Sequence, residues 1–193
     1  NPSLVGSEMC IRDRTCDWTT GKIYNDKVSE KGASYSLKES VYLNLPRAID
    51  IDVDGSGNLF VCDWRGGRFK FAGKGKKVGM VQKLTKKGLK ARPFPKLREM
   101  STSELVSQLM SSSAVRRLEV QRVLLAKGET GSAKPLTSLI KDSGLSIESR
   151  IAAIFTLSQM KGMTADQFLQ TFAKDWNDLK EIQQYLTRAA GDL

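Results

Sequence analysis

The chain has 193 residues, of which 40% are apolar and 27% are charged. That composition is typical of a globular protein, and the length suffices for one large domain or two small ones. Histidine is absent, which excludes Ser-His catalysis and any histidine-ligated metal or haem site built within this chain. The sequence also has no apolar run long enough to cross a membrane, no Cys-x-x-Cys pair and no phosphate-binding glycine loop.

The formal net charge is +10, and it is concentrated in one stretch. Residues 65–98 contain thirteen lysines and arginines and no acidic residue. Such a stretch can hold a polyanion by counterion release. The simpler interpretation is that these charges only hydrate loops and sheet faces.

The first fourteen residues, NPSLVGSEMCIRDR, resemble a translated sequencing adapter. We interpret residues 1–14 as a non-native lead-in, against the alternative of a genuine disordered segment, and leave them out of the fold prediction. Because the chain opens with Asn1 instead of Met, we expect the parent protein to extend upstream. We also expect it to extend beyond Leu193, where the last helix has no clear polar cap.

A nine-residue segment occurs twice, as Cys16–Tyr24 and as Cys62–Lys70, 46 residues apart. Each copy reads Cys-Asp-Trp, two variable residues, Gly, a basic residue and an apolar residue. A repeat of about 40 to 50 residues made of short strands is typical of β-propeller blades. The matching motif positions are Asp17, Trp18, Gly21, Asp63, Trp64 and Gly67.

The repeated residues have both structural and functional interpretations. Trp18 and Trp64 are predicted to anchor neighbouring blades, with ligand stacking as the alternative. Asp17 and Asp63 are predicted to make turn hydrogen bonds. The two cysteines that open the copies are predicted to be small buried apolar residues, and a disulfide between them is left open.

Four segments around the second copy predict strands. They are Ala48–Val53, Leu59–Cys62, Arg68–Phe71 and Val78–Leu84. Pro46 precedes the first of them, at a position that suits a strand edge. This order predicts one four-stranded antiparallel blade, preceded by part of another.

The turn after the first of these strands matches part of an EF-hand calcium loop. Asp52, Asp54, Ser56 and Asp63 have the spacing of its first, third, fifth and twelfth positions. The flanks read as strands instead of helices, and Asp at the twelfth position has less reach than Glu. An ordinary hairpin turn, with Asp and Asn bonding local backbone groups, is therefore the preferred interpretation.

Residues 86–100 predict a basic, proline-containing linker, after which the apolar period changes from two to about 3.6 residues. Capping boxes at Ser101 and Thr164, an N-cap at Ser113 and a stop at Gly128 mark helix ends. Six helices are expected, over residues 101–110, 114–127, 135–141, 146–161, 164–176 and 177–190.

The predicted helices repeat with a register. Arg116 and Gly128 match Arg150 and Gly162 at an offset of 34 residues. Paired short helices with a period in the thirties predict a HEAT-like solenoid. The expected fold class is thus multi-domain, a partial β-propeller followed by an α-helical HEAT-like solenoid, with bounds at 15–85, 86–100 and 101–193.

The segment Pro46–Trp64 resembles an NHL-type propeller repeat, in which Pro opens the strand and Asp-Gly-x-Gly-Asn makes the turn. With the linker and the Ala-Val-Arg-Arg-Leu-Glu-Val-Gln-Arg helix, the chain is similar to the large secreted dehydrogenase-like proteins of planctomycetes and verrucomicrobia. Those combine a glucose/sorbosone-dehydrogenase-like propeller, HEAT-like repeats and a C-terminal Cys-x-x-Cys-His cytochrome domain. The resemblance implies a periplasmic or extracellular parent with a PQQ-like cofactor and haem c, neither of them held by this chain.

The resemblance carries no catalytic residue onto this chain. We therefore expect a non-catalytic scaffold fragment of a protein linked to sugar or alcohol oxidation and electron transfer. Its expected partners are the remaining blades and cytochrome domain of the parent, with protein contacts through the helices. The alternative from a different class is a basic binding module for an acidic protein or nucleic acid. A third interpretation is a calcium-dependent structural repeat.

Overall fold

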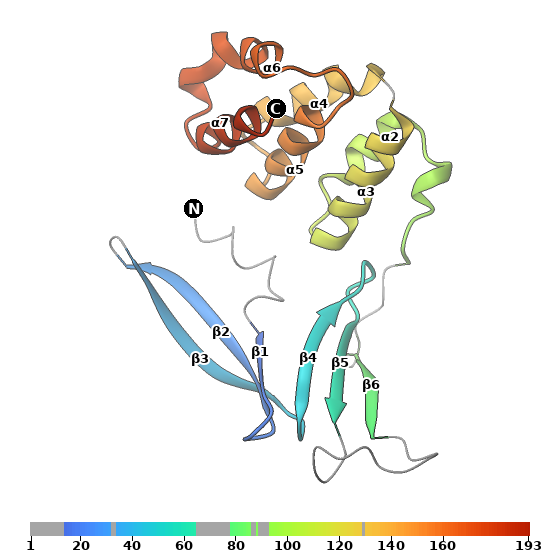
Figure 1. Ribbon diagram of the computed structural model, residues 1–193, viewed down its shortest axis with the longest axis vertical. Helices are drawn as coiled ribbons and strands as arrows, with labels where there is room; N and C mark the ends of the chain where they lie inside the picture. The colour runs from blue at the N-terminus through green and yellow to red at the C-terminus, as the bar shows by residue number, and fades with distance from the viewer. Residues whose placement is uncertain (1–13, 32–33, 65–77, 86–87, 89–92, 129) are drawn as a thin grey trace. The chain divides into compact units, whose positions relative to one another are not determined.

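The computed structural model describes residues 14–31, 34–64, 78–85, 88, 93–128 and 130–193. The chain divides into two compact units, Asn1–Pro93 and Phe94–Leu193. In the described residues, the first unit contains the strands and the second the helices (Figure 1). We call them the β unit and the helical unit.

The β unit consists of two antiparallel three-stranded sheets. Strands β1 (Arg14–Asp17), β2 (Lys22–Lys31) and β3 (Ser34–Asn44) form the first sheet in that order. Strands β4 (Ala48–Val53), β5 (Leu59–Trp64) and β6 (Gly79–Leu84) form the second. The buried residues of this unit form one small cluster of Ile23, Leu45, Ala48, Ile51 and Val61.

The predicted four-stranded blade is wrong. β6 pairs directly with β5, from Leu59 opposite Leu84 to Trp64 opposite Gly79. The other edge of β5 pairs with β4, so no strand can lie between β5 and β6. The third predicted strand, Arg68–Phe71, lies outside the described residues.

The predicted fold class, a partial propeller followed by a HEAT-like solenoid, is accordingly corrected. The described chain forms two small three-stranded sheets followed by six α-helices, without a closed sheet in the part that the structure describes.

The helical unit has six α-helices and three short 3₁₀ segments. The α-helices are α2 (Thr102–Gln108), α3 (Ala114–Lys127), α4 (Ala133–Lys141), α5 (Ile147–Ser158), α6 (Ala165–Phe172) and α7 (Gln183–Gly191). The 3₁₀ segments are η1 (Leu97–Glu99), η2 (Thr130–Ser132) and η3 (Ala173–Asp178). None of the helices in the described ranges is long and apolar enough to span a membrane.

The ends of the helices have the predicted caps. Ser101 accepts a hydrogen bond from the Glu104 backbone N–H, and Glu104 Oε2 accepts one from Ser101 N, which completes the capping box. Thr164 and Gln167 repeat this arrangement at α6. Gly128 ends α3 with a φ of 62°, a left-handed conformation that glycine adopts without strain.

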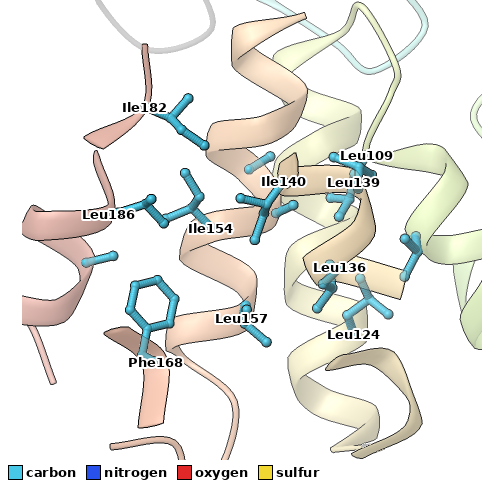
Figure 2. Packing of buried hydrophobic residues seen from close by; sticks show 14 of the residues in the cluster. Leu109, Leu124, Leu136, Leu139, Ile140, Ile154, Leu157, Phe168, Ile182 and Leu186 are labelled. Atoms are coloured by element: carbon cyan, nitrogen blue, oxygen red, sulfur yellow. The ribbon is translucent and has the colours of Figure 1, made fainter. Parts of the chain in front are cut away.

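Helix α5 is the centre of the helical core. It packs against α3, α4, α6 and α7, and most of its side chains are buried. Figure 2 shows Ile154 of α5 between Ile140 of α4 and Leu186 of α7, with Phe168 of α6 nearby. The helical unit therefore has one continuous apolar core.

The predicted register between α3 and α5 is one residue off at the helix starts. Ser113 and Ser146 are the N-caps of α3 and α5, an offset of 33 residues. This offset matches Arg150 with Arg117, four residues after each cap, and not with Arg116. Arg117 and Arg150 are both buried, whereas Arg116 is partly exposed.

Candidate functional site

The turn between β4 and β5 is held together by Asp54. Its Oδ1 accepts hydrogen bonds from the backbone N–H groups of Ser56 and Asn58, each at 2.8 Å, and its Oδ2 accepts one from Asn58 Nδ2 at 2.8 Å. Burial raises the pKa of this carboxyl, but the hydrogen bonds from Asn58 and Ser56 outweigh burial and leave the pKa below its usual value. Asp54 therefore performs the turn-forming role that the sequence favours.

Asp63 lies elsewhere in the sheet. It is buried, its Oδ1 accepts a hydrogen bond from the Met80 backbone N–H at 3.1 Å, and its Oδ2 accepts one from the Gln82 side chain. Asp63 is thus a tie between β5 and β6, and the predicted turn hydrogen bonds are replaced by this tie. It pairs with Ala48 at the end of the hairpin away from the turn, roughly 13 Å along β5 from Leu59.

The structure therefore does not bring the four predicted calcium ligands together. Asp52, Asp54 and Ser56 share the turn region, and Asp63 does not. The carboxylate of Asp52 is exposed and accepts a hydrogen bond from the Val53 N–H at 2.7 Å. No group of three or more potential metal-ligating side chains occurs among the described residues. A calcium site stays a prediction, carried by the three turn residues.

The first motif copy forms a tight turn. Asp17 Oδ1 accepts hydrogen bonds from the backbone N–H groups of Thr19 and Thr20 at 2.8 and 3.0 Å, as predicted. The bond from the Thr20 backbone is the main reason that the pKa of Asp17 lies below its usual value. Gly21 has a φ of 67°, and a Cβ there would meet the Pro46 Cα at 3.2 Å. Gly21 and Pro46 are thus packed against each other.

Arg47 links the two tryptophans of the repeat, a role that the sequence analysis missed. Its guanidinium lies 5.7 Å from the ring centroid of Trp18, and its carbonyl accepts a hydrogen bond from the Trp64 backbone N–H at 3.0 Å. Arg47 also has a φ of 57°, which is unusual for a side chain other than glycine. Both tryptophans are therefore structural here; Gly67 lies outside the described residues.

Cys16 and Cys62 are free thiols. Cys16 is half-buried and Cys62 is exposed, so the predicted burial applies only in part. Burial raises the pKa of the Cys16 thiol, and the charges of Asp50 and Cys62 raise it further. Cys16 is accordingly a weak nucleophile at neutral pH.

Two buried carboxylates are not fully hydrogen-bonded. Asp26 in β2 accepts a hydrogen bond from Thr15 Oγ1 at 3.0 Å through Oδ2, while its Oδ1 has no partner. Glu148, in the first turn of α5, has an unpartnered Oε1. In the described chain neither carboxylate belongs to a cluster of three or more ligating groups.

The β2–β3 hairpin has an exposed apolar face. Val28 is directly opposite Leu37, and Tyr24 is directly opposite Val41. Because alternate strand residues point to the same side, these residues and Tyr35 share one face. The members of this apolar hairpin face with large exposure are Val28 (48%), Tyr35 (71%), Leu37 (62%) and Val41 (50%).

Comparisons of the chain with protein-family models, with curated proteins and with solved structures gave no match. The function is therefore argued from the residues described above.

Proposed function

We propose that the chain is a non-catalytic scaffold module, which assembles with another protein through the apolar hairpin face of its β unit. The motif carboxylates support a structural role. Asp17 and Asp54 each hold a turn, and Asp63 ties two strands together. These groups stabilise the sheets, and their oxygens are occupied in doing so.

The apolar hairpin face is the observation that carries this proposal. β1 pairs with β2 only as far as Asn25, so the remainder of β2 and β3 is a two-stranded ribbon. An isolated hairpin is marginally stable in water, and a contiguous exposed apolar patch commonly marks an interaction site. Covering Leu37 and its neighbours with an apolar protein surface would stabilise the ribbon, at about 25 cal/mol per Å² of apolar area removed from water.

The test uses the full chain with paired variants. Val28→Thr with Leu37→Thr removes apolar character from the face while keeping residues that suit a strand. Ile49→Thr with Val81→Thr makes the same kind of change at exposed strand positions outside the face. The first pair should reduce binding of a hydrophobic dye and self-association measured by light scattering, and the second pair should reduce them much less. An equal effect of both pairs would rule out the apolar hairpin face as the assembly surface.

The resemblance of the sequence to secreted dehydrogenase-like proteins supports a setting for this scaffold beside an electron-transfer domain, outside the cytoplasm. The intact gene tests that setting. A Cys-x-x-Cys-His motif further along the parent sequence would support it, and a complete parent gene without such a motif would remove its basis.

A further inference from the structure

The opposite face of the same hairpin is basic and rich in hydroxyl groups. Lys27 is directly opposite Lys38, Ser29 is opposite Ser36, and Lys31 is opposite Ser34. We call this the lysine face. Its members are Asn25, Lys27, Ser29, Lys31, Ser34, Ser36, Lys38 and Ser40, and all except the partly exposed Asn25 are exposed.

The charges on the lysine face are not balanced within the hairpin. Lysines directly opposite each other on antiparallel strands repel, and opposite charges are the stabilising combination. Neither Lys27 nor Lys38 forms an ion pair with a carboxylate in the described chain. An anionic ligand lying across both strands would relieve this repulsion.

Hydroxyl groups flank the lysine pair in a regular arrangement. Ser29 Oγ and Ser36 Oγ are 2.7 Å apart, and Ser40 Oγ donates to the Asn25 carbonyl at 3.3 Å. Lysine and serine side chains are typical donors to phosphate oxygens in nucleic-acid complexes. The lysine face lacks the exposed aromatic and apolar anchors that form the centre of most protein interfaces.

The shape of the hairpin also fits a duplex. Figure 1 shows β2 and β3 as a long pair of strands with β1 at one end. Beyond Asn25 the ribbon has only two strands, and the major groove of B-DNA admits a two-stranded β-ribbon. The net charge of +10, with thirteen basic residues and no acidic one in residues 65–98, adds long-range attraction for the same ligand.

From these observations we infer that the lysine face is a binding surface for duplex nucleic acid, with Lys27 and Lys38 contacting backbone phosphates. This inference goes beyond the scaffold role, which uses the other side of the ribbon. The recognition is independent of base sequence, because the face offers charge and hydroxyl groups to the backbone.

The experiment measures binding of the full chain to a mixed-sequence DNA duplex over a range of salt concentrations. The test variant is Lys27→Gln with Lys38→Gln, and the control is Lys134→Gln with Lys180→Gln, two exposed lysines of the helical unit. Both variants lose the same net charge. Losing two phosphate contacts should lower the slope of log K against log salt by about 1.8 and weaken binding by roughly 60-fold at about 0.1 M salt.

The control pair should leave the slope nearly unchanged. Equal losses in both variants would overturn the inference, because they would show attraction to the overall charge alone. Polyglutamate or phosphatidylserine vesicles that bind with the same dependence on Lys27 and Lys38, in place of the duplex, would assign the face to an acidic protein or a membrane and also overturn it. An unchanged or higher melting temperature of the test variant would exclude misfolding, since the substitution relieves like-charge repulsion.

Discussion

Replacing the buried Arg150 with methionine should destabilise the helical unit by about 2 kcal/mol. The side chain of Arg150 is 2% exposed, and its Nε donates a hydrogen bond to the Ile140 carbonyl at 2.9 Å. Ile140 lies in the last turn of α4, where helix carbonyls lack partners within the helix. Arg150 therefore caps α4 from α5, and no water can replace it because Ile140 is fully buried.

The size of the effect follows from these contacts. A hydrogen bond to a charged group contributes about 1.5–3 kcal/mol, and methionine keeps the apolar stem while losing that bond. Arg150→Ala also removes two buried methylene groups, at about 0.8 kcal/mol each, for a total loss of about 4 kcal/mol. The ion pair of Arg150 with Glu181, 3.2 Å away, should contribute less than about 0.5 kcal/mol, because the Glu181 side chain is 68% exposed.

Urea unfolding followed by helical circular dichroism measures these losses. With m of roughly 1–2 kcal/mol per M, Arg150→Met should lower the midpoint by about 1–2 M. Arg122→Met is the matched control, since Arg122 is exposed and pairs only with Glu119 on its own helix. A midpoint for Arg150→Met equal to that of the control, or a loss in Glu181→Gln as large as in Arg150→Met, would refute the capping role.

Three further predictions concern the β unit. Gly21→Ala should lower its stability by more than Gly57→Ala in thermal unfolding, because both substitutions incur about 1–2 kcal/mol of left-handed strain but only Gly21 has backbone atoms within 3.2 Å of the new Cβ. The depressed pKa of Asp54 means that its contribution to stability is present above the unfolded pKa and is lost as the pH falls through the lower folded pKa. The unfolding free energy should therefore fall below about pH 4, and Asp54→Asn should flatten that dependence in urea titrations. Peptide mapping after brief alkylation should show Cys62 modified before Cys16, since Cys62 is exposed and the pKa of Cys16 is raised; equal rates would contradict this.

The helical unit was largely predictable because its signals are local. A cap such as Ser101 with Glu104, or the left-handed Gly128, depends on residues within one turn. The register was harder, because matching Gly128 with Gly162 aligned Arg150 with the wrong arginine. Counting from the N-caps corrects it, since the depth of an arginine in the core depends on its distance from the helix start.

The β unit was less predictable because strand pairing is non-local. The alternation in residues 48–53 predicts a strand, but nothing within the strands specifies that β6 pairs directly with β5. The role of Asp63 is set by Met80 and Gln82, seventeen and nineteen residues further along the chain. Arg47 was missed for the same reason, since its two contacts join the separate motif copies at Trp18 and Trp64.

The two proposals for the hairpin are independent because of strand geometry. Side chains of successive residues point to opposite faces, so Val28 and Leu37 face one side while Lys27 and Lys38 face the other. A protein covering the apolar hairpin face would leave the lysine face open to solvent. It would also hold the ribbon rigid, which reduces the conformational entropy lost when an anion is bound. The Val28→Thr and Leu37→Thr pair should therefore leave the salt dependence of duplex binding intact, because that dependence reflects only the number of phosphate contacts.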